Sequence, residues 1–149
     1  MNDMKKKVLI VGAGGFMGSH FAEAALQRGW EVTAGVRQLT SRKYLRDERL
    51  RFAVFDFDNP DTLADTLRQN SPEGGWDYII YNLGATKALR FEDFNRINYQ
   101  YLRSFFEALK AVDKVPERFL YMSSLSVLGN GDEKGYAPFT EERPAIPDT

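Results

Sequence analysis

The chain has 149 residues, 43% of them hydrophobic, and this length and composition fit one globular domain with its own core. Its 20 basic and 21 acidic residues are interspersed, and no stretch approaches the roughly 20 apolar residues of a membrane span, so neither nucleic acid nor a membrane is an expected partner. Because it has no cysteine and one histidine, His20, thiolate chemistry and multi-histidine metal sites are excluded, no metal site is expected, and a cytoplasmic location suits the chain.

Strands and helices are expected to alternate along the chain. Residues 8–11 are a β-branched run closed by glycines, typical of a strand buried on both faces, and residues 16–28 carry apolar positions at helical spacing before Gly29. The later expected elements are strands at 31–36, 50–55, 76–81 and 118–122, with helices at 61–69 and 91–112 between them. This alternation predicts an α/β fold, namely a Rossmann-type doubly wound parallel sheet of five strands in the order 3-2-1-4-5.

A glycine motif lies between the first strand and its helix. Gly12, Gly15 and Gly18 form GxxGxxG, with Gly14, Phe16 and Met17 among the intervening residues. In this position one glycine permits the tight turn, one lets a pyrophosphate approach the backbone, and one lets the helix pack on the sheet. The helix N-terminus then offers N–H groups to phosphates, which predicts a dinucleotide site. The alternative is a glycine-rich turn that binds no ligand.

The segment VGAGGFMG resembles the TGxxGFxG motif of the extended short-chain dehydrogenase/reductase family, which includes NAD-dependent epimerases, dehydratases and dihydroflavonol-type reductases. Four later segments resemble the same family in the same order. Asp56 with Phe57 resembles the pair near the adenine, and Asn98 resembles the Asn of the NVxGT segment. The residues that the resemblance assigns to the cofactor site are Gly12, Gly14, Gly15, Phe16, Met17, Gly18, Asp56, Phe57, Asn82, Leu83, Gly84, Lys87, Asn98, Met122 and Ser123.

The segment MSSLSVLG, residues 122–129, resembles the family's SSxxVYG. The resemblance places Ser124 at the catalytic Ser/Thr, while Leu128 stands where a Tyr is usual. Two structural alternatives stay open, because Ser124 can also satisfy nearby backbone groups and Asp56 can serve only as a turn or capping residue.

The end of the second predicted strand bears on the choice between NAD and NADP. A cofactor with a free 2′-hydroxyl is usually held there by an acidic side chain, and this chain has none. Arg37 follows the strand directly, with Arg42 and Lys43 close behind, and a guanidinium suits a 2′-phosphate. NADP is therefore preferred over NAD, with a solvated surface charge as the alternative reading of Arg37.

The Tyr and Lys that the family spaces as YxxxK on its next helix do not occur in this sequence. We therefore expect residues 1–128 to be an NAD(P)-binding domain and 129–149 an active-site or substrate segment, with a C-terminal substrate lobe absent. On its own the chain is expected to turn over no substrate. It is also expected to form a homo-oligomer, because a sheet face without its last helix exposes apolar surface.

Three classes of function compete. The first is the cofactor-binding portion of an NAD(P)-dependent epimerase, dehydratase or reductase acting on a nucleotide sugar or another small carbonyl or hydroxyl compound. The second is a non-catalytic NADP sensor or regulatory module, and the third is a flavodoxin-like or phosphate-binding domain without nicotinamide. Local candidates for substrate contact are Thr86, Lys87, Leu125 and the loop 130–138.

Overall fold

The computed structural model describes residues 5–129, 131, 135 and 137–146. Its five strands are β1 (Lys7–Val11), β2 (Glu31–Val36), β3 (Arg51–Val54), β4 (Tyr78–Tyr81) and β5 (Arg118–Tyr121). They form one parallel sheet in the order β3-β2-β1-β4-β5, which confirms the predicted fold class and strand order. The helices are α1 (Phe16–Gln27), α2 (Leu63–Asn70), α3 (Phe91–Asn95) and α4 (Tyr101–Ala111), with short helical turns at Pro60–Thr62, Arg96–Gln100 and Leu125–Leu128.

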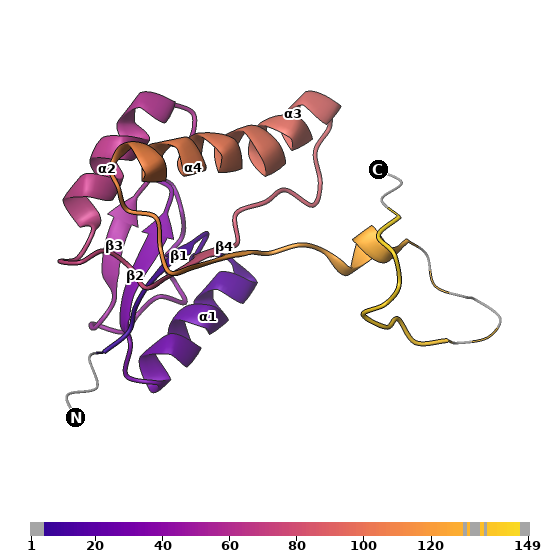
Figure 1. Cartoon of the computed structure of the whole chain (residues 1–149), viewed down its shortest axis with the longest axis horizontal. Coiled ribbons are helices and arrows are strands. Elements are labelled where there is room, and N and C mark those ends of the chain that lie inside the picture. Colours follow the sequence, from indigo (N-terminus) through magenta and orange to yellow (C-terminus); the bar gives the residue numbers. More distant parts are fainter. Residues whose placement is uncertain (1–4, 130, 132–134, 136, 147–149) are drawn as a thin grey trace.

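Helices cover both faces of the sheet (Figure 1), with α2 and α4 on one side and α1 on the other. The apolar side chains of β1 alternate between these two layers, because successive residues of a strand point to opposite faces. Leu9 and Val11 belong to the core beneath α2 and α4, whereas Val8 and Ile10 belong to the core beneath α1. This two-sided burial explains why β1 is a continuous apolar run rather than an alternating one.

The expected helix over 91–112 is interrupted. Residues Arg96–Gln100 form a π-helical turn between α3 and α4, so one continuous α-helix was wrong in this detail. Apolar spacing alone does not distinguish a π turn from an α turn, since each keeps one face toward the core. Such turns are frequent at functional sites because they redirect a side chain from the helix surface.

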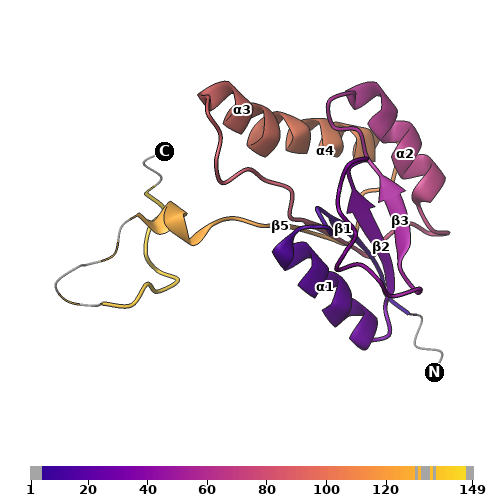
Figure 2. The ribbon, with the colours of Figure 1, turned by 180° about the vertical axis from the view of Figure 1, so that it is seen from behind.

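The sheet is less covered over β4 and β5. On the side of α1 a hollow of about 550 Å³ is lined by Trp30, Tyr78, Ile80 and Leu120, and Leu120 is 50% exposed. After β5 the chain leaves the body of the molecule as an extended arm (Figure 2). Of the helices in the described residues, none combines the length and apolar character needed to cross a membrane.

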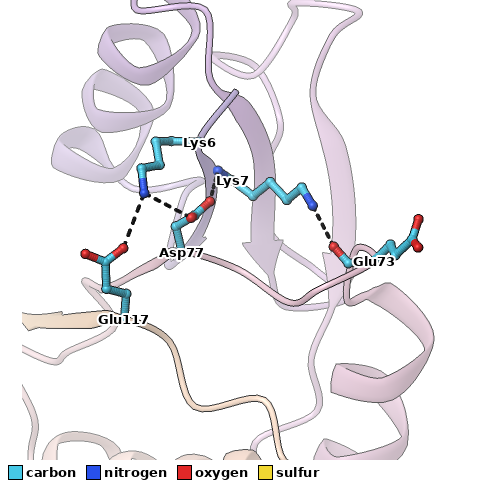
Figure 3. Close-up of polar contacts among 5 residues, drawn as sticks. All are labelled: Lys6, Lys7, Glu73, Asp77 and Glu117. Atoms are coloured by element: carbon cyan, nitrogen blue, oxygen red, sulfur yellow. Dashed lines mark hydrogen bonds and ion pairs between the residues drawn. The ribbon is translucent and has the colours of Figure 1, made fainter. Parts of the chain in front are cut away.

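A group of charged side chains joins strand starts at the amino edge of the sheet (Figure 3). The Lys6 amine lies 3.2 Å from the Asp77 carboxylate and 3.3 Å from that of Glu117. Asp77 also accepts a 2.7 Å hydrogen bond from the Lys7 N–H. Burial opposes the ionisation of Asp77, but its hydrogen bonds and the Lys6 charge outweigh that effect and hold its pKa below the usual value.

The depressed pKa predicts an acid-sensitive contribution of Asp77 to stability. A carboxyl with a lowered pKa in the folded state stabilises the fold above its unfolded pKa of about 3.9 and loses that effect as pH falls through the folded value. Asp77→Asn is expected to lower the free energy of unfolding at pH 7, and the difference from the unsubstituted chain should shrink below about pH 5. Urea unfolding across pH 7 to 3 measures this, with Glu117→Gln as the more exposed control. A difference independent of pH would contradict it.

Candidate functional site

The glycine turn after β1 packs between the ends of two neighbouring strands. Gly12 has φ +83°, and the N–H groups of Gly12 and Ala13 donate to the Gly35 carbonyl of β2 at 2.9 and 3.1 Å. A Cβ on Gly12 would lie 2.9 Å from the Asn82 carbonyl oxygen just beyond β4. Only a residue without a side chain fits this turn, as the motif predicted.

Helix α1 begins beside this turn. Gly15 is its N-terminal cap and supplies no side-chain hydrogen bond, and the first turn carries no acidic residue. A Cβ on Gly18 would overlap the Gly12 carbonyl, so glycine lets the helix approach the turn closely. The positive end of the helix dipole therefore lies beside a turn whose glycines carry no side chains, a cradle that fits the pyrophosphate of a dinucleotide. Phe16 and Met17, in the first turn of the helix, are exposed and flank this cradle.

A hollow of about 830 Å³ lies beyond the ends of β2 and β3, and its lining includes Arg37, Asp56 and Phe57. Asp56 accepts a 3.1 Å hydrogen bond from the Asp58 N–H, so it performs the turn role that the sequence left open. The Phe57 ring is only 4% exposed and stacks on Tyr101 with 5.4 Å between ring centroids. Phe57 thus supports the floor of the hollow from within the core.

Tyr101, the first residue of α4, links this hollow to that helix. Its hydroxyl donates to the Asp58 carboxylate, and burial together with this hydrogen bond raises the pKa of Tyr101 to about 12. The phenol therefore stays protonated near neutral pH and remains a donor.

The three basic residues that the sequence singled out after β2 are placed differently. Arg37 is exposed and lines the hollow that Asp56 also lines. The Arg42 guanidinium instead lies over the Phe52 ring at 4.3 Å, and the Lys43 amine lies 4.6 Å from the centroid of its neighbouring Tyr44 ring. Neither Arg42 nor Lys43 lines this hollow, so Arg37 is the basic side chain positioned at it.

A second hollow, of about 460 Å³, lies where β4 and β5 end. Its lining contains several predicted residues, namely Asn82, Leu83, Gly84, Thr86, Asn98, Met122, Ser123 and Ser124. The π turn directs Asn98 at the backbone of Ala85, whose N–H donates to Oδ1 at 2.7 Å and whose carbonyl accepts from Nδ2 at 3.1 Å. Both polar groups of Ala85 are thereby satisfied, which holds the segment after β4 against the helix. A Cβ on Gly84 would lie 3.3 Å from Asn98 Oδ1, so glycine eases this approach.

The Ser124 hydroxyl lies at the mouth of this hollow and caps the helical turn Leu125–Leu128. It accepts a 3.3 Å hydrogen bond from the Ser126 N–H, and the two hydroxyl oxygens are 2.8 Å apart. The alternative left open for Ser124, that it satisfies nearby backbone groups, is therefore present, and a catalytic role for Ser124 stays a prediction. Ser126 was missed; the spacing Ser-x-Ser was the available signal. Thr40, which contacts the glycine turn, was missed as well, and no motif marked it.

Other predicted contacts are not brought to the hollows. Lys87 is exposed on the segment between β4 and α3 and lines neither hollow, so its role stays a prediction. Leu125 is exposed on the turn that Ser124 caps. Of the loop 130–138, residues 130, 132–134 and 136 lie outside the described residues.

The profile of the NAD dependent epimerase/dehydratase family matches residues 8–148. A curated relative, ceramide reductase from Caulobacter vibrioides (strain NA1000 / CB15N), is 33% identical over 124 residues, which are 83% of this chain and 36% of the reductase. UDP-glucose 4-epimerase of Thermus thermophilus in complex with NAD aligns with a TM-score of 0.74 and 21% identity, covering 95% of this chain and 44% of the epimerase. The Bordetella bronchiseptica enzyme WbmG in complex with NAD aligns with a TM-score of 0.75 and 17% identity, covering 98% of this chain and 45% of that enzyme. The chain spans less than half the length of these proteins, and the two structures establish likeness of fold alone.

Proposed function

Because the chain belongs to the NAD dependent epimerase/dehydratase family, we propose that it forms the NADP-binding portion of a reductase or epimerase acting on a small carbonyl or hydroxyl compound. The observation that carries the proposal is the glycine cradle, in which a Cβ on Gly12 or Gly18 would meet backbone atoms. Backbone N–H groups at a helix N-terminus, left clear of side chains, are what a pyrophosphate needs.

When bound, the nicotinamide supplies hydride exchange with a carbon of the substrate. In the proposal, the chain's own residues bind and orient the reactants. The N-terminus of α1 holds the pyrophosphate, Arg37 pairs with the 2′-phosphate, and the adenosine occupies the hollow beside Asp56. At the other hollow, the Ser124 hydroxyl gives up its contact with Ser126 and hydrogen-bonds the substrate oxygen. Asn98 keeps the segment after β4 in place.

A reductase is favoured over an epimerase by the comparisons. The relative that shares 33% identity is a ceramide reductase, whereas the structural likeness to the epimerases rests on 18% to 22% identity. Arg37, directly after β2, suits the 2′-phosphate of NADP. The proposal assigns residues 1–128 to cofactor binding and 129–149 to the substrate side, and it places the protein in the cytoplasm as a homo-oligomer.

A titration of the chain with NADPH and with NADH, followed by nicotinamide fluorescence, tests this function. NADPH is expected to bind more tightly than NADH, and Arg37→Ala should weaken NADPH binding by about 10- to 150-fold, the loss expected for a charge-assisted contact of about 1.5 to 3 kcal/mol. NADH binding should change little. The matched control is Arg42→Ala, because Arg42 lies over Phe52 rather than at the hollow. Failure to bind either nucleotide would refute the proposal.

The second candidate is an NADP sensor or regulatory module without catalysis. It is favoured by the capping hydrogen bonds that engage Ser124, which give that hydroxyl a structural role. The two functions differ in the effect of Ser124→Ala on the protein that carries the complete active site. Lost turnover with unchanged NADPH affinity supports the enzyme, and no change in either supports the module.

A further inference from the structure

We propose that Thr40 is a positioning residue that holds Arg37 beside the glycine turn and so sets the preference for NADP. This inference rests on the proposed function and concerns the turn at residues 37–40, directly after β2. Thr40 matches none of the family segments described above. Three sets of contacts around the glycine turn carry the inference.

The first set consists of two hydrogen bonds between Thr40 and the backbone of Arg37. The Thr40 hydroxyl oxygen accepts the Arg37 N–H at 3.1 Å, and the Thr40 N–H donates to the Arg37 carbonyl at 2.9 Å. Both backbone polar groups of Arg37 are therefore bonded to one residue. With its backbone fixed in this way, the Arg37 side chain starts from a defined point at the mouth of the hollow that both residues line.

The second set packs the same residue on the glycine turn. A Cβ on Gly14 would overlap the Thr40 methyl carbon, Cγ2, and would lie 3.2 Å from the Ser41 carbonyl oxygen. Gly14 is not one of the three glycines of GxxGxxG, so the motif does not require it. The contact explains the fourth glycine, since the backbone of the turn approaches Thr40 closely only without a side chain.

The third set joins the glycine turn to the end of β2. Gly35, two residues before Arg37, accepts hydrogen bonds from Gly12 and Ala13 in the glycine turn. The segment after β2 is thus fixed to the glycine turn at Gly35 and again at Thr40, and Arg37 lies between these two points. The position of the Arg37 backbone relative to the pyrophosphate cradle is therefore set by a short segment anchored at both ends. It gives a fixed starting point for the side chain that the proposal pairs with the 2′-phosphate.

Two substitutions separate the two functions of the Thr40 side chain. Thr40→Val keeps the shape and loses the hydroxyl, whereas Thr40→Ser keeps the hydroxyl and loses the methyl group. Thr40→Val is expected to weaken NADPH binding by about 3- to 10-fold, the range for one hydrogen bond, with NADH binding unchanged. Thr40→Ser should retain most of the preference for NADPH. In an Arg37→Ala background Thr40→Val should have no further effect, because Thr40 acts through Arg37.

The readouts are dissociation constants from nicotinamide fluorescence and, independently, the rise in thermal midpoint at saturating nucleotide. Circular dichroism of each variant without nucleotide identifies any loss of folding. If Thr40→Val weakens NADPH and NADH equally, or weakens NADPH further in the Arg37→Ala background, Thr40 supports the site generally and the inference is overturned. If the unsubstituted chain binds both nucleotides alike, this inference fails while the proposed function stands. If it binds neither, both fail.

Discussion

Replacing Gly12 by alanine is expected to destabilise the fold by about 2 to 5 kcal/mol and to abolish nucleotide binding. Gly12 has φ +83°, where an L-residue costs about 1 to 2 kcal/mol. The added Cβ would also lie 2.9 to 3.1 Å from three backbone atoms of Asn82 and Leu83, and displacing packed structure costs about 1 to 3 kcal/mol more. Because those atoms also border the second hollow, relief of the clash would distort both parts of the site. Urea unfolding and the NADPH titration measure the two effects.

Gly29→Ala is the matched control for this experiment. Gly29 has φ +76°, nearly the same backbone conformation, but a Cβ there meets nothing within 4 Å. Gly29→Ala should therefore lower the free energy of unfolding only by the cost of a positive φ, about 1 to 2 kcal/mol. Nucleotide affinity in the folded fraction should not change. Equal losses from the two substitutions would show that the close approach to Asn82 contributes nothing.

Phe105→Ala is expected to lower the free energy of unfolding by about 3 to 5 kcal/mol, a large part of the about 5 to 15 kcal/mol by which a typical domain is stable. The ring is fully buried under α4, and its partners are the rings of Phe55, Phe57, Tyr81 and Phe119, with centroids 5.4 to 6.5 Å away. Truncation would leave a cavity between the helix and the strands β3, β4 and β5, which these partners adjoin. Thermal and urea unfolding give the loss directly.

The next residue provides the comparison. Phe106 packs on Phe119 with 4.4 Å between centroids but is 38% exposed, so Phe106→Ala removes one ring contact and less buried surface than Phe105→Ala. Its expected cost is about 1 kcal/mol. Similar losses at both positions would contradict the assignment of Phe105 to the centre of the core.

The strands could be predicted because each is a short segment rich in apolar residues, and some are bounded by glycine. The run ending at Val11 stops at Gly12, and β2 has the predicted bounds of 31–36. The strand expected at 76–81 begins only at Tyr78. Trp76 precedes the strand but is buried, and it donates its indole N–H to the Thr33 hydroxyl at 3.1 Å. Apolar character marks burial, and burial extends beyond the hydrogen-bonded ladder.

The site was predictable where a backbone constraint leaves a mark on the sequence. Gly12 and Gly18 are visible because close approach permits no other residue, and Asn98 is visible through the family resemblance. The π turn that aims Asn98 at Ala85 left no mark, since its side chains keep a helical face. The contact of Thr40 with Gly14 joins two loops and has no periodicity, so only the fold brings it to light.

The position of β1 in the sheet has a consequence during synthesis of the chain. β1 pairs with β2, the next strand to be made, but its other neighbour is β4, and the bonded residues Lys7 and Asp77 are 70 positions apart. At roughly 5 to 20 residues per second, that interval lasts roughly 4 to 14 s on the ribosome. Throughout it, one side of β1, which is apolar from residue 8 to 11, has unpaired N–H and C=O groups, the condition that favours pairing with another chain. The central strand of the finished sheet is therefore an edge strand in the nascent chain, and a chaperone that shields it would act in this interval.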